Sequence, residues 1–283
     1  MTDDNEMGIT MENDSYTAGV ERWRRQKDAE LRAEEGWLAL AGLFWLKEGP
    51  NSFGADPDGD IVLPASSAPA YAGSFEFHGG ATTLRVADGV AVTVNGEPAG
   101  SAPLHPDTDS APERIALGTL TMLIIKRGAR YGVRVWDRGS PARTSFTGRR
   151  WFPLRASYRI AAAFVAYEPP KPLAVANILG DTESMPSPGY AMFTLDGQEC
   201  RLDALPDPNG LAFYFRDATN GETTYPTGRY LKAAPPRGGQ VTLDFNKAYS
   251  PPCAFTEFAT CTLPPPQNRL PLPVVAGELY DHA

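Results

Sequence analysis

Residues 114–137 read RIALGTLTMLIIKRGARYGVRVWD, and this stretch decides the fold class. Short runs rich in Val, Ile, Leu and Thr alternate with turns, and no helical spacing of apolar residues interrupts them. Runs of this length and composition are typical of antiparallel strands. The stretch therefore predicts three strands, over residues 114–117, 119–127 and 131–136.

The same pattern extends outward toward the N-terminus. Turn signals divide this region into short segments, and they stand at 56–60 (DPDGD), 78–80 (HGG), 87–89 (ADG) and 95–96 (NG). Four further strands are expected between them, at 60–63, 73–78, 82–87 and 90–94. Strands this short, with so little helix between them, argue for an antiparallel sandwich.

Beyond residue 158 the sequence is again typical of strands. We expect them at 159–167, 173–177, 191–195, 198–203, 211–217, 230–233 and 240–245, with turns at 196–197 (DG) and 207–210 (DPNG). The strict alternation of AFYFRD (212–217) indicates a sheet with one buried face. Before the first sandwich, an amphipathic helix is predicted over 16–35 and an apolar strand or strand-plus-turn over 36–54.

These patterns predict an all-β protein made of two packed antiparallel β-sandwich-like units and one N-terminal amphipathic helix. The expected division is a disordered tail (1–14), the helix with its apolar segment (15–48), a β-sandwich (49–140), and a second β-unit with an ordered Pro-rich C-terminal segment (141–283).

Composition restricts the functional classes. The 283-residue chain has a formal net charge of −8, which disfavours broad contact with nucleic acid or an anionic membrane. The first residues lack the features of a signal peptide, and the longest apolar run, 37–46, is far short of the ~20 residues of a membrane helix. With three cysteines and no dense disulfide framework, we expect a cytoplasmic protein with reduced thiols and neither a nucleic-acid nor a membrane partner.

No metal or cofactor is expected. A zinc site needs about four nitrogen or sulfur ligands. The chain offers three cysteines and three scattered histidines, at His78, His105 and His282. It contains no P-loop, no GxGxxG after a strand, no GxSxG and no HExxH.

The first sandwich resembles a forkhead-associated domain over about 85 residues. The resemblance rests on FGADPDGDIVLP (53–64), the VNG turn (94–96), and the strand pair IALGTLTMLIIKRG that leads to RVWD. A phosphothreonine-binding member would have an arginine after the first glycine. Here Ala55 follows Gly54, and the next loop reads PASSAPAYAG (64–73), so the resemblance does not imply phosphopeptide binding.

Longer strings resemble the bacterial family of unknown function DUF1684. They include FYFRDATNGETTYPTGRYL (213–231), LDFNKAYSPPCAFTEFATCTLPPPQNRL (243–270) and VVAGE (274–278). The segments GWLALAGLFWLKEGPNSFG (36–54), KRGARYGVRVWD (126–137) and FTGRRWFP (146–153) fit the same pattern. The resemblance covers nearly the whole chain from about Tyr16 onward, and it implies no activity.

The segment 223–277 is the expected site. Its rigid Pro-Pro turns indicate an ordered, non-helical wall, and it carries more polar and aromatic groups than a plain loop needs. The candidate ligand-binding residues are Arg229, Asp244, Asn246, Tyr249 and Arg269. Asp244 and Asn246 end a strand on the same face. The structural alternative is a buried salt bridge, with Arg269 paired to Asp244 or Glu257.

Three residues are catalytic candidates. Asp244 and Glu257 could act as general bases, and Cys253 as a nucleophile whose pKa an arginine lowers. No histidine lies in the segment, so packing is the favoured role of Cys253 and Cys261. Six arginines between 138 and 159 form either a guanidinium-lined mouth for an anion or an ordinary surface connection.

Three functional hypotheses follow. The first is binding of a small polar or anionic metabolite in a pocket walled by residues 223–269. The second is a hydrolase or isomerase-like enzyme, with Asp244 or Glu257 as base and Arg229 or Arg269 holding an anion. The third is a protein interaction module that uses the N-terminal β-sandwich.

Overall fold

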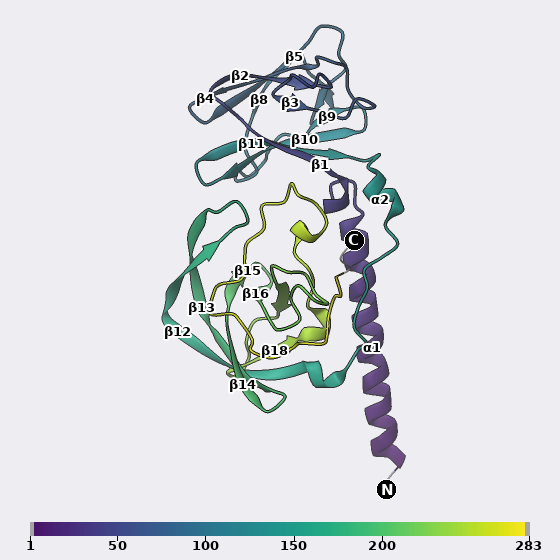
Figure 1. Cartoon of the computed structure of the whole chain (residues 1–283), viewed down its shortest axis with the longest axis vertical. Coiled ribbons are helices and arrows are strands. Elements are labelled where there is room, and N and C mark those ends of the chain that lie inside the picture. The colour runs from purple at the N-terminus through teal and green to yellow at the C-terminus, as the bar shows by residue number, and fades with distance from the viewer. Residues whose placement is uncertain (1–2, 281–283) are drawn as a thin grey trace. The chain divides into compact units, whose positions relative to one another are not determined.

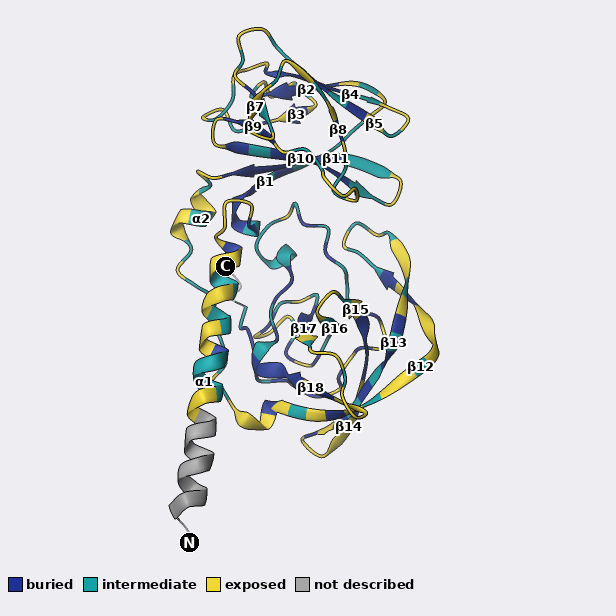
Figure 2. Cartoon of the chain, turned by 180° about the vertical axis from the view of Figure 1, so that it is seen from behind, coloured by how far each residue is buried: buried dark blue, intermediate teal, exposed yellow. Residues whose placement is uncertain are grey.

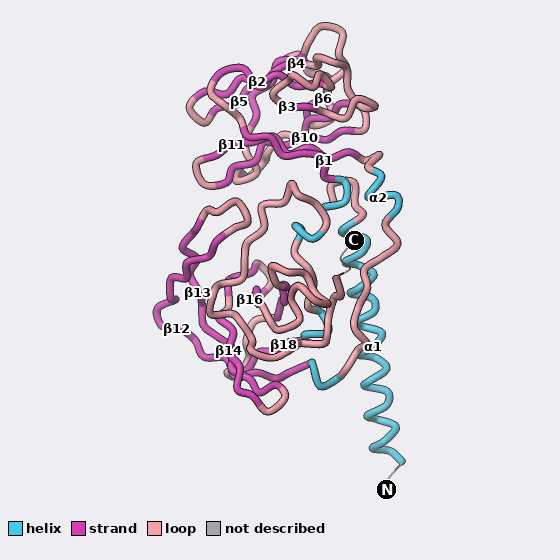
Figure 3. The backbone as a smooth tube through the Cα atoms, in the orientation of Figure 1, coloured by secondary structure: helices cyan, strands magenta, loops and turns pink. Residues whose placement is uncertain are grey.

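The computed structural model describes residues 3–280, with side chains described from residue 14, and it confirms the all-β class (Figure 1, Figure 3). Four sheets and one long N-terminal helix make up the described chain. Contacts divide the chain into two compact units. We call Met1–Ala29, Thr147–Ala254 and Thr260–Ala283 unit 1, and Glu30–Phe146 with Phe255–Ala259 unit 2.

Helix α1 runs from Asp3 to Leu31, whereas the sequence predicted a helix over 16–35. It begins within the segment expected to be a disordered tail, 1–14. Residues 15–48, predicted as one N-terminal segment, are divided between the two units.

Unit 2 contains two sheets that face each other, as Figure 1 shows. The six-stranded sheet has the order β1-β11-β10-β9-β6-β7, and the five-stranded sheet the order β3-β2-β4-β5-β8. The strands of the first are β1 (Leu40–Trp45), β6 (Thr93–Val94), β7 (Glu97–Pro98), β9 (Ile115–Leu117), β10 (Leu120–Arg127) and β11 (Arg130–Asp137). Those of the second are β2 (Gly49–Gly54), β3 (Ile61–Val62), β4 (Gly73–His78), β5 (Ala81–Val86) and β8 (Ser101–Leu104).

The uninterrupted apolar run of β10 follows from burial on both faces. Met122 and Ile124 belong to a buried core cluster that also contains Phe53 and Phe75 of the other sheet. Their neighbours in sequence point to the opposite face of the sheet and join a second cluster around Trp136. A strand covered on both faces needs apolar residues at consecutive positions rather than at alternate ones.

Unit 1 contains the other two sheets. Their orders are β14-β13-β12-β18 and β15-β16-β17. The strands are β12 (Arg159–Ala176), β13 (Thr182–Leu195), β14 (Gln198–Asp203), β15 (Leu205–Asp207), β16 (Gly210–Phe215), β17 (Arg229–Ala233) and β18 (Gln240–Asp244). Both sheets contribute to one core, seen as dark blue ribbon in Figure 2, which includes Phe193, Phe213, Phe215 and Phe245.

Short helical segments connect the strands. They are α2 (Pro141–Ser145) and the 3-10 turns η1 (Trp37–Ala39), η2 (Ala156–Tyr158), η3 (Phe245–Lys247) and η4 (Pro252–Ala254). Two-residue turns close two of the hairpins, with Asn95 at φ 52° and Asp196 at φ 49°, each followed by a glycine with positive φ. This is the turn chemistry that NG and DG predict.

The longest strands differ most from the sequence prediction. β12 is continuous over 159–176, although its proline-rich middle predicted two separate strands. β13 begins at Thr182 rather than at 191. The pairing of β12 with β13 shifts register between Ala166 and Lys171, where the prolines stand. An irregularity of this kind accommodates prolines inside a strand. From the local sequence alone, the same prolines predict that the strand ends.

Among the described residues, no helix is both long and apolar enough to cross a membrane.

Asn51 provides a test of how unit 2 is held together. Its side chain is 1% exposed, accepts a hydrogen bond from the Lys47 N–H at 2.9 Å, and donates to the Lys47 carbonyl at 2.8 Å and the Phe75 carbonyl at 3.2 Å. We expect Asn51→Ala to lower the free energy of unfolding by about 1–3 kcal/mol, because buried backbone groups lose their partners. Chemical denaturation measures this. Asn209→Ala, at an exposed asparagine, is the control, and an equal effect of the two substitutions would contradict the account.

Candidate functional site

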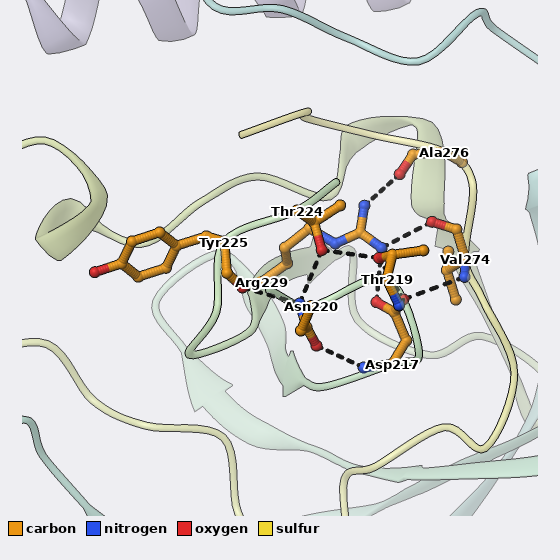
Figure 4. Close-up of polar contacts among 8 residues, drawn as sticks. All are labelled: Asp217, Thr219, Asn220, Thr224, Tyr225, Arg229, Val274 and Ala276. Carbon is orange, nitrogen blue, oxygen red and sulfur yellow. Dashed lines mark hydrogen bonds and ion pairs between the residues drawn. The ribbon is translucent and has the colours of Figure 1, made fainter. Parts of the chain in front are cut away.

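Arg229 forms a buried ion pair with Asp217 (Figure 4). Both side chains are 0% exposed, and the Arg229 Nη2 lies 2.7 Å from the Asp217 Oδ2. The same guanidinium donates to the Val274 carbonyl at 2.8 Å and to the Ala276 carbonyl. Burying two charges is stable only when their hydrogen bonds are made, and here backbone groups of the C-terminal segment make them.

The turn that follows Asp217 completes its hydrogen bonds (Figure 4). The Asp217 Oδ1 accepts from the Thr219 N–H at 2.8 Å and from the Val274 N–H at 3.2 Å. Asn220 donates to the Thr224 hydroxyl at 2.9 Å and to the Tyr225 carbonyl at 3.0 Å. Arg229 is therefore the centre of a structural network, and its bonded guanidinium nitrogens are not free to hold a ligand.

Asp244 and Asn246 lie together, as their spacing predicted, but in another network. The Tyr16 hydroxyl donates to the Asp244 Oδ1 at 2.8 Å, and the Asn246 amide donates to the same oxygen at 3.3 Å. Asn246 also donates to the Arg155 carbonyl at 2.8 Å and accepts from its N–H at 3.1 Å. The pKa of Tyr16 lies above its usual range. Burial is the largest cause, and the hydrogen bond to the Asp244 carboxylate is the second. These bonds fix helix α1 and the chain before β12 to the end of β18.

The other predicted residues are dispersed. The Tyr249 ring packs edge-on against Trp23 with centroids 6.1 Å apart, and against Tyr230 at 5.9 Å. Glu257 is exposed and belongs to unit 2, whereas Asp244 belongs to unit 1. The structure thus joins Asp244 only to Asn246 among the ligand-binding candidates.

The arginine-rich connection also has structural partners. Arg149 is 6% exposed and lies 3.4 Å from Glu278, a buried carboxylate that the sequence reading did not single out. Burial raises the pKa of Glu278 to about 7, against the opposing effect of Arg149. The Arg143 Nε donates to the Arg32 carbonyl at 2.7 Å.

Two arginines that face outward line a hollow in unit 1. It has a volume of about 480 Å³, and we call it the arginine hollow. Its wall is formed by Ala174, Ala176, Thr182, Arg216, Leu263, Pro264, Pro265, Pro266, Asn268 and Arg269. Of the residues predicted to bind a ligand, Arg269 is in this wall.

The backbone brings Arg216 and Arg269 together. They form a parallel bridge, in which the Arg216 N–H donates to the Asn268 carbonyl at 2.9 Å and the Leu270 N–H to the Arg216 carbonyl at 2.8 Å. The Arg216 Nε donates to the Thr227 carbonyl at 3.1 Å. Within the described chain, the Arg216 Nη groups and the whole Arg269 guanidinium have no hydrogen-bond or ion-pair partner.

Asn268 fixes the loop that carries Arg269. Its side chain is 1% exposed, accepts from the Asp203 N–H at 2.7 Å, and donates to the Asp203 carbonyl at 2.8 Å and the Tyr214 carbonyl at 3.0 Å. Three prolines before it hold the backbone dihedrals of the loop. The sequence reading missed Asn268 and Arg216. The signal was present in PPPQNRL, because an asparagine in a rigid loop often bonds backbone groups.

A second hollow, of about 560 Å³, adjoins the first. Ala174 and Pro266 line both, and Lys171 and Arg201 add positive charge to the second. Arg201 is paired with Asp203 at 3.1 Å, whereas the Lys171 ammonium lies 5.7 Å from the centre of the Tyr167 ring. Cationic side chains thus line both hollows, and Ala174 of β12 lies in the wall of each.

In the described part of the chain, no group of three or more His, Cys, Asp or Glu side chains is placed to hold a metal. His282 lies outside the described residues.

Comparison with known proteins identifies the family. Residues 144–279 match the family model described as "Protein of unknown function (DUF1684)", and the chain belongs to this family. An uncharacterized protein of Haloarcula marismortui, whose solution structure is known, is 34% identical over 50% of this chain and 80% of that chain, with a TM-score of 0.43. No curated protein matches.

Forkhead-associated domains are also among the solved structures that match. One is the FhaA domain in complex with the intracellular domain of Rv3910, 19% identical over 33% of this chain and 96% of that chain, with a TM-score of 0.24. Another is the FHA-2 domain of a Mycobacterium tuberculosis ABC transporter, 22% identical over 31% of this chain and 77% of that chain, also with a TM-score of 0.24. This likeness is weak.

The free energy of unfolding distinguishes the buried, ion-paired Arg229 from the exposed Arg269. We expect Arg229→Ala to lower the free energy of unfolding by about 3–5 kcal/mol, because Asp217 is left charged and buried without its partner. Arg269→Ala, the matched substitution at an exposed arginine, should change it by less than about 0.5 kcal/mol. Chemical denaturation of both variants gives the comparison. Equal losses would contradict the assignment of Arg229 to the scaffold and Arg269 to the site.

Proposed function

We propose that the protein binds a small anionic ligand, a carboxylate or a phosphate, in the arginine hollow. The observation that carries the proposal is that the Arg216 Nη groups and the Arg269 guanidinium, which have no partner within the described chain, lie in the wall of one hollow. Arg suits such ligands because its planar group can donate two parallel hydrogen bonds to a carboxylate or phosphate.

The setting of the pair supports the proposal. The hollow is large enough for a small metabolite, at about 480 Å³. Arg216 is half-buried and held at its Nε, so little side-chain freedom is lost when its Nη groups bind. The chain as a whole has a net charge of −8. The two arginines place positive charge in the hollow, and this charge attracts anions locally.

Binding is better supported than catalysis. The described residues that line the arginine hollow include no carboxylate and no cysteine, so neither Asp244, Glu257 nor Cys253 is placed there as a base or nucleophile. The hydrolase or isomerase hypothesis also required Arg229 or Arg269 beside such a group.

The third hypothesis, an interaction module in the N-terminal sandwich, stays a prediction. We also propose a cytoplasmic location, because three cysteines do not make up the dense disulfide framework of a secreted domain.

Calorimetric titration with inorganic phosphate and with citrate, at low and constant ionic strength, tests the proposal. We expect saturable binding of at least one of them, and a loss of affinity of about ten-fold or more in Arg216→Ala and in Arg269→Ala, since a charge-assisted hydrogen bond contributes about 1.5–3 kcal/mol. Glycerol, which is uncharged, should not bind.

Arg237→Ala is the matched control. Arg237 is exposed in the same unit and lies outside the arginine hollow, so its removal changes the net charge equally. Affinities in this variant should equal those of the wild type. No binding of either anion, or equal losses in all three variants, would overturn the proposal.

A further inference from the structure

Two thiols of the C-terminal segment lie in contact. The backbone N–H of Cys253 donates to the Cys261 Sγ at 3.0 Å. The nitrogen and the sulfur of one cysteine are separated by only a few covalent bonds. The Cys261 sulfur contacts the Cys253 nitrogen, so a rotation about χ1 of Cys253 can bring the Cys253 sulfur within reach of it. Both cysteines are free thiols.

Each cysteine is also fixed at its backbone. The Tyr225 hydroxyl donates to the Cys253 carbonyl at 2.8 Å, and the Ile178 N–H donates to the Cys261 carbonyl at 2.9 Å. The Tyr225 ring in turn packs edge-on against Tyr280, with centroids 4.9 Å apart. These hydrogen bonds hold both backbones in place beside each other, and the 3.0 Å contact brings the Cys261 sulfur against Cys253.

The two thiols differ in exposure and in acidity. Cys253 is half-buried, whereas Cys261 is 6% exposed. The hydrogen bond from the Cys261 thiol lowers the pKa of Cys253, and the same contact together with burial raises the pKa of Cys261. The thiolate is the reactive form, so Cys253 is the group that reacts first.

We propose that Cys253 and Cys261 form a peroxide-reactive dithiol, which a hydroperoxide converts into an intramolecular disulfide. A low-pKa, accessible cysteine beside a second thiol is the arrangement of redox-sensing sites. The proposal is independent of the anion site, since neither cysteine lines the arginine hollow.

The reaction balances in two steps. The Cys253 thiolate attacks one oxygen of the hydroperoxide. An S–O bond forms as the O–O bond breaks, and the departing oxygen takes up a proton and leaves as water or an alcohol. The Cys261 sulfur then attacks the Cys253 sulfenic acid, the S–S bond forms as the S–O bond breaks, and the hydroxyl leaves with the Cys261 proton as water. Two thiols lose two electrons, which the peroxide gains.

Peptide mapping after a brief treatment of the full-length, reduced protein with hydrogen peroxide tests the proposal. We expect a Cys253–Cys261 disulfide, while Cys200 stays open to alkylation after unfolding. Cys200 is the internal control, because it is 4% exposed and burial raises the pKa of its thiol. In untreated native wild type, iodoacetamide should modify Cys253 at least about ten-fold faster than Cys200.

Two variants assign the roles. Cys261→Ser should accumulate a sulfenic acid at Cys253, which dimedone traps, and Cys253→Ser should give neither a disulfide nor an adduct at Cys261. A dimedone adduct at Cys261 instead, or alkylation of Cys253 no faster than that of Cys200, would overturn the proposal. The alkylation rates come from the wild type, so they decide the question even if a variant fails to fold.

Discussion

The buried ion pair between Asp217 and Arg229 is the interaction on which the C-terminal half of the protein depends. Arg229 begins β17, Asp217 follows the end of β16, and the pair bonds backbone groups at Val274 and Ala276. The desolvation of two charges costs several kcal/mol per ion, and removing either partner leaves the other uncompensated. The pair therefore ties two strands and the C-terminal segment to one geometry.

This geometry also places the proposed site. Arg216 and Asp217 are consecutive residues in extended chain, so their side chains point to opposite faces. Asp217 points inward to Arg229, and Arg216 lines the arginine hollow. The loop of Arg269 is set against Arg216 by Asn268, which bonds both Asp203 and Tyr214. Fixed positions of this kind reduce the entropy lost when a ligand is bound.

Much of the fold could be predicted from local patterns, because the strands are short and their turns carry glycine beside Asn or Asp. β4 and β14 lie at the predicted residues, 73–78 and 198–203. The continuous β12 could not be predicted, since its prolines are compatible with a strand only where the pairing with β13 is irregular.

Local sequence patterns also predict only part of the candidate site. The alternation of AFYFRD indicates that Arg216 and Asp217 face opposite ways, but not which one faces the core. That depends on Arg229 and on residues 274–276, which are distant in sequence. The pairing of residue 216 with 269 is likewise a tertiary contact that no local rule gives. Sequence alone therefore groups Arg229 with Arg269 as ligand-binding candidates, although Arg229 is buried and ion-paired whereas Arg269 is exposed.

Arginine side-chain NMR tests the division between scaffold and site most directly. In nitrogen–proton spectra of the Nε–H groups, assigned by Arg216→Lys, Arg229→Lys and Arg269→Lys, phosphate is titrated into the full-length protein at constant ionic strength. The account predicts that the Arg216 and Arg269 signals move together and saturate, while the Arg229 signal stays in place. Movement of the Arg229 signal, with Arg216 and Arg269 unchanged, would contradict it.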